Sequence, residues 1–383
     1  MRILQLGKFY PIRGGVEKVM WDLTRGLAEK GVRCDMLCAM RTNANIDLKD
    51  AQYHEYVGNN RSTFRFGNGC RIHTVPAFGK WAGTMLAPGM IPWLKLHRKD
   101  YDIIHIHHPD PMAALALRLS HFKGKVVLHW HSDIVSQKFF LFFYKPLQRW
   151  LIKRADVIIG TTPVYLEASP WLKKVQDKCV AVPIGIDPLE YDPDRAEIVR
   201  KRFHKRKLIL TVGRLVPYKG FPYLVDAMLH LPDDYHLAIG GAGPMRKKLE
   251  KQIVQAGLSK RVTLTGFISY EEIADWFGAA DVFVLSSIYK SEAFGIVQLE
   301  AMSCGKPVVA TTIPGSGVSW VNKDGVSGLN VPPEDSKALA EAILRIDRER
   351  EHFAEGAQRL FQERYTLDKM IEGVKAVYDK LLK

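Results

Sequence analysis

Residues 291–302 read Ser-Glu-Ala-Phe-Gly-Ile-Val-Gln-Leu-Glu-Ala-Met and are the most informative stretch of this 383-residue chain. They follow an apolar run, 281–287, that has the composition of a buried strand. Because no helix breaker follows Gly295, we expect a helix to begin near it, with Glu292 just before the helix and Glu300 about one turn inside. On one helix the two carboxylates would be separated by ~80° around the axis and ~12 Å along it. They are therefore too far apart to share a proton.

The start of this expected helix is also a candidate anion site. Backbone N–H groups in the first turn of a helix have no partner within the helix, so those of residues 295–297 are free to bind phosphate. A ligand held by Glu292 at one end, by Glu300 at the other and by these amides between them would have the length and charge of a nucleoside diphosphate sugar.

The rest of the chain alternates short β-branched runs with longer helical patterns, which predicts parallel sheets. Its length favours two domains over one. The stretch 182–193 contains three prolines and a glycine and interrupts both patterns, so we place the boundary there, with domains at 1–190 and 191–366. Ligands of such sheets bind beyond the carboxyl ends of the strands, so two facing sheets would line a cleft.

Charge is distributed unevenly between these halves. Residues 1–190 contain 27 Lys and Arg against 16 Asp and Glu, a balance of +11, and the remainder of the net +14 lies in the second half. The first half is therefore expected to meet an anionic partner. The opening residues 1–6 are expected to form a strand rather than a signal peptide. A cytoplasmic protein is expected from five scattered cysteines without a Cys-x-x-Cys: Cys34, Cys38, Cys70, Cys179 and Cys304.

Three glycine-rich loops follow expected strands. Gly14-Gly15 opens a helix and is either a phosphate-binding turn or an ordinary one. The segment 213–220, Gly-Arg-Leu-Val-Pro-Tyr-Lys-Gly, contains Arg214 and Lys219, which can clamp a diphosphate or form a solvated basic loop. The third loop, 240–244, can turn its amides toward phosphate or base.

Histidines crowd the ends of two expected strands. His105 and His107 share one face by alternation, as do His129 and His131. A zinc site is conceivable but lacks helical His-x-x-x-His spacing, so no metal is expected, and these residues are predicted to line the ligand-facing wall.

Two segments of the first half mix aromatic and basic side chains. Residues 139–154 combine five aromatic residues at the start with four cations after them, and residues 81–99 contain two tryptophans and several cations. Residues 139–154 are too short for a membrane span. They are interpreted either as a segment for a membrane interface or an amphipathic acceptor, or as a core helix with a solvated basic face. Residues 81–99 are a second candidate surface.

Taken together, these motifs resemble the retaining glycosyltransferases of family 4, which have the GT-B fold. The resemblance covers nearly the whole chain, from Gly14-Gly15 through 130–132 and 213–220 to the Glu-x7-Glu segment. It implies an α/β architecture of two doubly wound, Rossmann-like domains with parallel sheets. The final helix, about 367–383, is implied to return to the N-terminal domain.

The resemblance also implies roles for individual residues. Glu300 would bind the ribose, and Glu292 would face the donor sugar. Arg214 and Lys219 would neutralise the diphosphate, while His131 would lie near the reacting face of the sugar. The expected donor contacts are completed by Gly14, Gly15, Gly213, Gly241, Gly243, Phe267, Ile268, Phe294, Gly295 and Ile296. The loop 314–318 departs from the family pattern, so no contact is assigned to it.

The expected activity is metal-independent transfer of a hexose from GDP-mannose or a UDP-hexose, without any cofactor. The acceptor would be a glycan or a polyprenyl-diphosphate-linked sugar in cell-surface polysaccharide synthesis, on the inner face of the cytoplasmic membrane. The alternatives are a nucleotide-sugar epimerase, a transferase acting on small soluble acceptors, and a basic nucleic-acid-binding protein. The last alternative lacks a groove-reading motif, so nucleic acid is not expected as a partner.

Overall fold

The chain folds into two compact units. The computed structural model describes residues 1–10, 15–41, 53–57, 61–81, 84–134, 138–204 and 206–383. The N-terminal unit comprises Met1–Ile184 and Leu367–Lys383, and the C-terminal unit comprises Gly185–Thr366. The first change of unit lies six residues before the expected boundary at 190, so residues 185–190 belong to the C-terminal unit.

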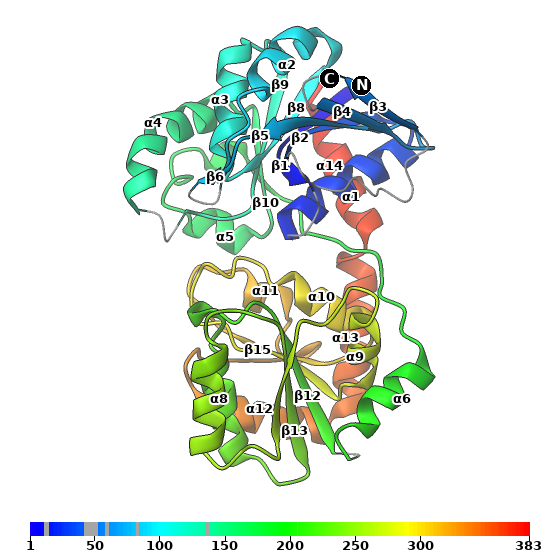
Figure 1. Cartoon of the computed structure of the whole chain (residues 1–383), viewed down its shortest axis with the longest axis vertical. Coiled ribbons are helices and arrows are strands. Elements are labelled where there is room, and N and C mark those ends of the chain that lie inside the picture. The colour runs from blue at the N-terminus through cyan, green and yellow to red at the C-terminus, as the bar shows by residue number, and fades with distance from the viewer. Residues whose placement is uncertain (11–14, 42–52, 58–60, 82–83, 135–137, 205) are drawn as a thin grey trace. The chain divides into compact units, whose positions relative to one another are not determined.

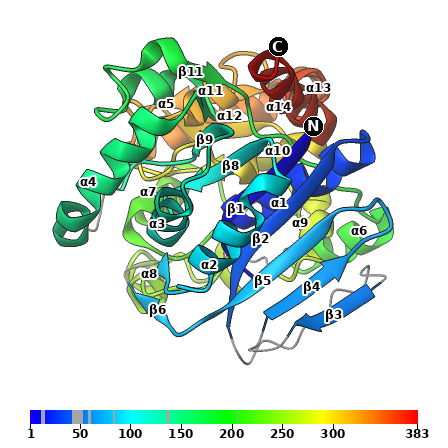
Figure 2. The same ribbon diagram turned by 90° about the horizontal axis from the view of Figure 1, so that it is seen from above.

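The N-terminal unit is built on a nine-stranded sheet in the order β11-β10-β9-β8-β1-β2-β5-β4-β3. All neighbours from β11 to β5 are parallel. The last two strands add an antiparallel hairpin beyond β5 that the sequence analysis did not predict (Figure 2). The strands are β1 (Arg2–Tyr10), β2 (Arg33–Arg41), β3 (Tyr53–Val57), β4 (Arg61–Arg65), β5 (Arg71–Ala77), β8 (Ile103–His108), β9 (Lys125–Trp130), β10 (Val157–Gly160) and β11 (Cys179–Ala181), with a separate hairpin of β6 (Lys80–Trp81) and β7 (Thr84–Met85).

Helices connect these strands, and two of them begin at a capping side chain. Asp110 accepts a hydrogen bond from the N–H of Ala113 at the start of α3, and Thr162 does the same for Tyr165 at the start of α5. In both helices a proline follows the cap, where its missing N–H costs nothing. The helices of this unit are α1 (Gly15–Glu29), α2 (Met90–His97), α3 (Pro111–Ser120), α4 (Lys138–Arg154), α5 (Pro163–Ala168) and α14 (Leu367–Leu381).

The last helix, α14, is part of the N-terminal unit and runs alongside α1 (Figure 1). Gly26 of α1 permits a close approach, because a Cβ there would lie 2.0 Å from Cδ1 of Ile371. One face of α14 is buried at a spacing of three to four residues, and that face ends at Tyr378, which is fully buried. The chain terminus therefore contributes a polar side chain to the interior of this unit.

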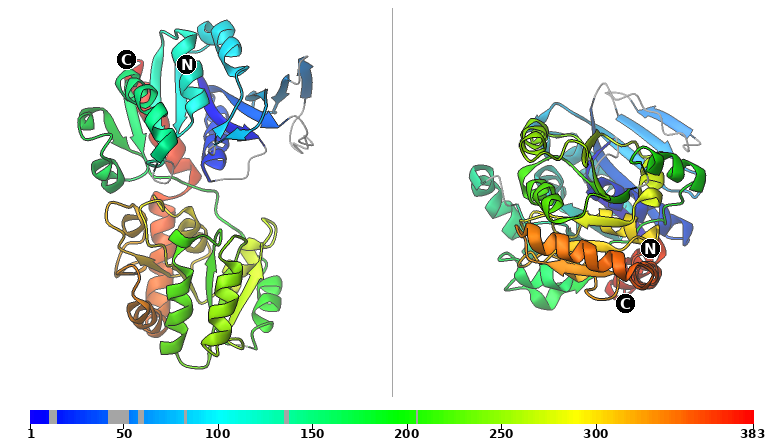
Figure 3. Two further views of the ribbon diagram at one scale, coloured as in Figure 1. Left: turned by 60° about the vertical axis from the view of Figure 1, so that its left-hand side comes forward. Right: turned by 90° about the horizontal axis from the view of Figure 1, so that it is seen from below.

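The C-terminal unit contains a six-stranded sheet in the order β14-β13-β12-β15-β16-β17, with every neighbouring pair parallel. Helices cover both of its faces (Figure 3). The strands are β12 (Lys207–Val212), β13 (Tyr235–Gly240), β14 (Val262–Gly266), β15 (Val282–Leu285), β16 (Val308–Thr311) and β17 (Gly328–Val331). The helices are α6 (Pro193–Lys201), α7 (Phe221–Ala227), α8 (Arg246–Gln255), α9 (Ile273–Ala279), α10 (Ile296–Ser303), α11 (Val318–Val321), α12 (Ser336–Arg348) and α13 (Arg350–Arg364).

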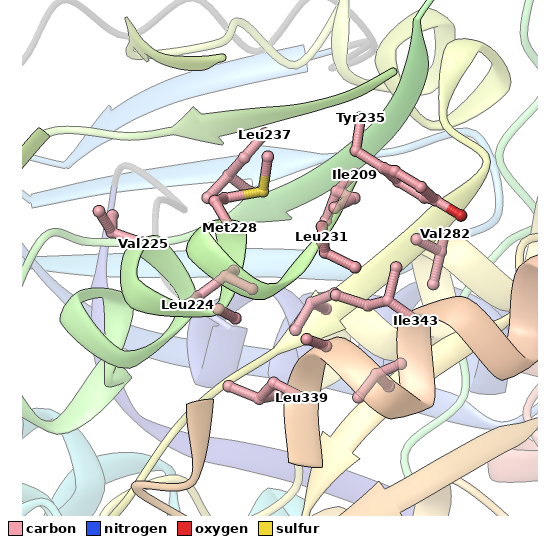
Figure 4. Close-up of a cluster of buried hydrophobic side chains, with 14 of the residues drawn as sticks. Ile209, Leu224, Val225, Met228, Leu231, Tyr235, Leu237, Val282, Leu339 and Ile343 are labelled. Atoms are coloured by element: carbon pink, nitrogen blue, oxygen red, sulfur yellow. The ribbon is translucent and has the colours of Figure 1, made fainter. Parts of the chain in front are cut away.

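An apolar core fixes the strands of this unit against its helices. Ile209 and Leu237 project from neighbouring strands toward Leu224 of α7 and Ile343 of α12, and each is fully buried (Figure 4). Burying side chains of this size stabilises the unit by ~1.5–3 kcal/mol each. The core thus fixes β12, from whose carboxyl end the candidate ligand loops start.

The prediction of two doubly wound α/β domains with parallel sheets is confirmed. None of the described helices combines the length and the apolar composition that crossing a bilayer requires.

Candidate functional site

The predicted helix of the Glu-x7-Glu segment is α10, which begins at Ile296 directly after Gly295. Gly295 has a φ of +75°, and a Cβ there would lie 2.6 Å from Leu285 Cδ2 and 2.8 Å from Gln298 Nε2. Only glycine meets both requirements without strain. The first amides of α10 therefore follow a turn that no side chain obstructs, and Glu300 lies on α10 with its side chain partly exposed.

Glu292 forms an ion pair with Lys219, a residue 73 positions earlier in the chain (292 minus 219). Lys219 Nζ lies 2.5 Å from Glu292 Oε2, and the two side chains are only 11% and 12% exposed. Ser287 donates a second hydrogen bond to the same carboxylate oxygen at 3.0 Å. Two residues that the sequence analysis assigned to sugar and diphosphate are thus held in direct contact.

Lys219 is positioned by a backbone that only glycine allows. It ends the short 3-10 helix η3 (Pro217–Lys219), and its carbonyl accepts a hydrogen bond from Ser286 Oγ at 3.0 Å. Gly220 follows with a φ of +67°, and a Cβ there would lie 2.0 Å from the carbonyl oxygen of Ser286. The loops after β12 and β15 therefore touch through main-chain atoms, which fixes Lys219 beside Glu292.

The loop after β13 packs against the same region. A Cβ on Gly241 would lie 1.9 Å from the carbonyl oxygen of Gly213, and one on Gly243 would lie 2.5 Å from that of Leu215. Both glycines also have positive φ, at +138° and +159°. Their presence is explained by close backbone packing, which leaves Arg214 exposed between the packed residues on either side.

Three predicted donor contacts have different surroundings. Phe267, after β14, is 81% exposed, whereas Ile268 is 8% exposed and packs over Gly240. Phe294 is 3% exposed and its ring meets Tyr365 edge-on. The side chain of Phe294 therefore packs in the interior, and its backbone borders the turn before α10, so its expected role at the donor stays a prediction.

Ser316 and Gly317 were missed because their loop departs from the family pattern. Ser316 is 1% exposed and donates its hydroxyl hydrogen bond to the carbonyl oxygen of Glu292. The N–H of Gly317 donates to the carbonyl oxygen of Ala293 at 2.9 Å. Together with Ser287 they fix the main chain and the carboxylate of Glu292. The only feature of the sequence that could have pointed to this contact is the hydroxyl of Ser316 in that loop.

The remaining predicted residues, His131 and Gly15, belong to the N-terminal unit. Gly15 is the exposed first residue of α1, and Gly14 lies outside the described residues. His131 follows the carboxyl end of β9 and is 5% exposed.

The histidines around His131 form a buried stack instead of a ligand-facing wall. His105, His107 and His129 are each at most 1% exposed. The rings of His129 and His131 lie 4.0 Å apart at an interplanar angle of 11°, and His105 meets Tyr378 edge-on. The prediction that these histidines line a ligand site is wrong for His105, His107 and His129. Strand alternation identifies which side chains share a face of the sheet, but it does not show what covers that face.

Three of these rings, those of His107, His129 and His131, offer nitrogen atoms within 4.8 Å of one another. A tetrahedral zinc ion requires lone pairs that converge, and lone pairs lie in the ring planes. The rings of His129 and His131 are nearly parallel, so their lone pairs run parallel and do not converge on one point. In addition, His107 Nδ1 is hydrogen-bonded to His131 Nε2 at 2.9 Å. This geometry favours neutral, hydrogen-bonded imidazoles.

The electrostatic surroundings of these histidines also favour the neutral imidazole. Burial lowers the pKa of His107 and of His131 well below the ordinary value, and the nearby Lys8 lowers both further. Lys8 itself donates from Nζ to the carbonyl oxygen of Pro109 at 2.7 Å, and its N–H donates to Asp110 at 2.6 Å. Lys8 and Asp110 sit at the carboxyl edge of this sheet and were not predicted.

Breaking the Lys219–Glu292 pair should destabilise the C-terminal unit. Lys219→Met leaves a largely buried carboxylate that keeps its hydrogen bond from Ser287 but has lost its counter-charge, so we expect a loss of ~1–3 kcal/mol in urea unfolding. Glu292→Gln in the same protein should restore most of it, because it removes the uncompensated charge. Lys375→Met, which breaks the exposed pair with Asp379, should change little. Equal effects of the two lysine variants would contradict the ion-pair assignment.

His129 should make the protein acid-sensitive. Burial lowers its pKa to about 3, whereas an unfolded histidine has a pKa of about 6.5. Between these values the unfolded chain binds a proton that the folded chain does not, so the free energy of unfolding falls as pH falls. His129→Leu should therefore reduce the change in stability between pH 7 and pH 5 by about 2 kcal/mol in urea titrations. His230→Leu, at an exposed histidine, should leave the pH dependence of stability unchanged. An unaltered pH dependence in His129→Leu would refute the conclusion that buried His129 makes the protein acid-sensitive.

Comparison with known proteins places this architecture in a family. The model described as Glycosyltransferase Family 4 matches residues 13–189, and the model described as Glycosyl transferases group 1 matches residues 194–360. The O-antigen chain mannosyltransferase C of Escherichia coli is 31% identical over 395 residues, covering 100% of this chain and 99% of that protein. The D-rhamnosyltransferase WbpZ of Pseudomonas aeruginosa is 30% identical, with coverage of 96% and 92%.

Solved structures share the fold. Anabaena HepE in complex with UDP superposes with a TM-score of 0.77 at 20% identity, covering 99% of this chain and 100% of that one. Sucrose-phosphate synthase from Thermosynechococcus elongatus gives a TM-score of 0.77 at 24% identity, with coverage of 100% and 99%. The chain therefore belongs to the family 4 (group 1) glycosyltransferases and has their GT-B fold.

Proposed function

We propose that this chain transfers a hexose from a nucleoside diphosphate sugar to a glycan or polyprenyl-diphosphate-linked acceptor, with retention of anomeric configuration and without a metal. The observation that supports the proposal most strongly is the Lys219–Glu292 pair beside the glycine turn that begins α10. It combines a fixed cation, free helix amides and a carboxylate at one edge of a sheet. These groups can stabilise the negative charge of a departing diphosphate and the positive charge of the sugar in the transition state.

In this proposal the diphosphate binds at the N-terminus of α10 and against Lys219 and Arg214. Lys219 exchanges its contact with Glu292 for the phosphate oxygens, and Arg214, which is exposed, closes on them from the solvent side. The negative charge that accumulates on the leaving diphosphate is then balanced by two side-chain cations and the helix amides. No bound metal ion has to supply that charge.

Glu292 is released toward the sugar when Lys219 turns to the phosphates. Ser287 and Ser316 keep it in place, because one bonds its carboxylate and the other its carbonyl oxygen. A carboxylate so fixed can stabilise the oxocarbenium-like sugar and bind its hydroxyls. Retention would follow if the acceptor attacks the face from which the diphosphate departs, with a phosphate oxygen taking the acceptor proton.

The relatives support a role in surface polysaccharide synthesis. Two full-length relatives are named as an O-antigen chain mannosyltransferase and a D-rhamnosyltransferase, and HepE was solved with UDP-glucose. A nucleotide-linked mannose or related hexose is therefore the first donor to test. The excess positive charge of residues 1–190 suits an acceptor that carries a diphosphate.

The donor assignment is tested by measuring turnover of GDP-mannose, GDP-rhamnose and UDP-hexoses, with and without EDTA. Arg214→Ala should reduce kcat about 100- to 1000-fold, the usual cost of removing a group that stabilises the transition state, without changing the melting temperature. Arg348→Ala removes another exposed arginine, from α12, and should remain active. Loss of activity in both variants, or sensitivity to EDTA, would contradict the proposal. Conversion of donor to an epimer without acceptor would identify an epimerase instead.

We also propose that the N-terminal unit docks on an anionic membrane at the cytoplasmic face. Phe142 of α4 is 70% exposed, and Arg149 and Lys153 of the same helix are exposed as well. On α2, Leu96 is 78% exposed beside the exposed Lys95. Apolar side chains flanked by cations are typical of interfacial segments.

The membrane proposal does not extend to every predicted residue. Trp93 is 8% exposed and stacks on His97 inside the unit, and Arg154 is occupied by Asp156 and two carbonyl oxygens. These two residues therefore stabilise the unit and are not available to a membrane surface.

Sedimentation with anionic vesicles tests the docking surface. The wild type should sediment at low salt and be released at high salt, because the attraction is screened. Phe142→Ser should sediment less, whereas Tyr270→Ser, which removes a 68% exposed aromatic residue from the C-terminal unit, should behave as wild type. Failure of the wild type to sediment would reject membrane docking.

A further inference from the structure

Three consecutive carbonyl groups, those of residues 292–294, precede the glycine turn that begins α10, and each accepts a hydrogen bond. The first accepts from Ser316 Oγ, and the second accepts from the N–H of Gly317 at 2.9 Å. The third accepts from Gln298 Nε2 at 3.0 Å. The same Nε2 lies 3.4 Å from the carbonyl oxygen of Val318, so all three donors belong to the side of the turn on which residues 316–318 lie.

These three bonds determine the direction in which the peptide groups of the turn point. In a trans peptide the N–H points away from the carbonyl of the preceding residue. The N–H groups of residues 293–295 are therefore turned away from residues 316–318. Within the described ranges of the chain, none of these three N–H groups forms a hydrogen bond. Together with the first amides of α10, they make a run of donors that are available to an anion.

The amide of Gln298 can make its contacts in only one orientation. The two atoms near Nε2, the carbonyl oxygens of Phe294 and Val318, are both acceptors, so the amide has to present its NH2 group to them. Turning the amide over would place Oε1 against two other oxygens. In the observed orientation Oε1 is buried and has no hydrogen-bond partner among the residues that the structure describes.

The bare oxygen shows that stability alone does not explain this glutamine. Gln298 is completely buried, and the side chains that α10 buries beside it, among them Leu299 and Met302, are apolar. An amide oxygen buried without a partner is unfavourable, and an apolar side chain of similar length would avoid that cost. The presence of an amide is therefore best explained by the hydrogen bond that its NH2 group donates to Phe294.

We propose that Gln298 is a positioning residue, whose hydrogen bond to the carbonyl oxygen of Phe294 keeps the N–H of Gly295 directed toward the diphosphate of the donor. Because the diphosphate is taken to bind at the start of α10, this role rests on the proposed function. All of the contacts that it requires lie within the C-terminal unit. Gln298 acts on the ligand only through the main chain, since its own side chain is completely buried.

Gln298→Met tests this role, because methionine keeps the length of the side chain and removes the donor. Calorimetry of the wild type identifies the tighter ligand of GDP and UDP, which is then used with every variant. In Gln298→Met we expect this nucleoside diphosphate to bind about tenfold more weakly, the effect of losing one hydrogen bond to a charged group. The corresponding nucleoside, measured as a competitor, should bind as it does to the wild type, because it carries no phosphate.

Gln252→Met is the matched control. Gln252 lies on α8 of the same unit, and its Nε2 donates to the carbonyl oxygen of Pro222 at 2.9 Å and to Asp226 at 2.7 Å. The change therefore also removes a side-chain amide that is bonded to the main chain, but at a distance along the chain from the turn before α10. Both affinities should remain those of the wild type.

A second variant acts on the same turn through a different side chain. Ser316→Ala releases the first of the three carbonyl groups, so it should also weaken the nucleoside diphosphate while leaving the nucleoside unchanged. It tests the orientation of the turn even if Gln298→Met folds poorly.

Hydrogen exchange of the main-chain amides gives a readout that a general loss of stability does not reproduce. At saturating nucleoside diphosphate, the N–H groups of residues 293–295 should exchange more slowly in the wild type and in Gln252→Met. In Gln298→Met the N–H of Gly295 should gain less protection at the same occupancy of the ligand.

The results separate the role of Gln298 from the proposed function. If the wild type binds neither GDP nor UDP, the proposed function fails and the role of Gln298 fails with it. If the wild type binds one of them and Gln298→Met binds it equally well, the role of Gln298 alone fails. Equal weakening of the nucleoside diphosphate and the nucleoside in Gln298→Met would indicate general damage to the unit and would also overturn the positioning role.

Discussion

The contact between Lys219 and Glu292 is the interaction around which the ligand edge of the C-terminal unit is arranged. It joins the loops that follow β12 and β15, two neighbouring parallel strands, so it can form only when both strands are in register. The lysine and the carboxylate neutralise each other, and both side chains are nearly nine-tenths buried. A donor diphosphate bound as proposed would meet a lysine that is already desolvated and held in place, and it would have to compete with one carboxylate.

Glycine makes that arrangement possible. Gly220, Gly241 and Gly295 all have positive φ, and a side chain on any of them would collide with main-chain atoms or packed neighbours. The loops consequently approach through their backbones, which are less mobile than side chains. In the sequence these glycines resemble phosphate-binding turns, and in the structure they allow the loops of the candidate site to pack closely. A backbone that is rigid for this reason can also bind an anion through its N–H groups.

Local patterns made part of this predictable. The start of α10 followed from Gly295 and the apolar run before it, because turn chemistry and periodicity act over a few residues. The partner of Glu292 did not follow, because the 72 intervening residues carry no signal of which loops will touch. Strand alternation grouped His107 with its neighbours on one face but could not reveal that α14 would cover them. No local pattern showed that the ring of Phe294 would pack against Tyr365.

Calorimetry distinguishes the roles that we propose for Glu292 and Glu300 at opposite ends of one donor. The affinities of the free nucleoside diphosphate and of the nucleotide sugar should be measured for the wild type, Glu292→Gln and Glu300→Gln. We predict that Glu300→Gln weakens both ligands by ~1.5–3 kcal/mol, the scale of a hydrogen bond to a charged group. Glu292→Gln should weaken the nucleotide sugar while leaving the nucleoside diphosphate unaffected or tighter. Equal losses for both ligands in Glu292→Gln, or an unchanged nucleotide affinity in Glu300→Gln, would rule out these roles.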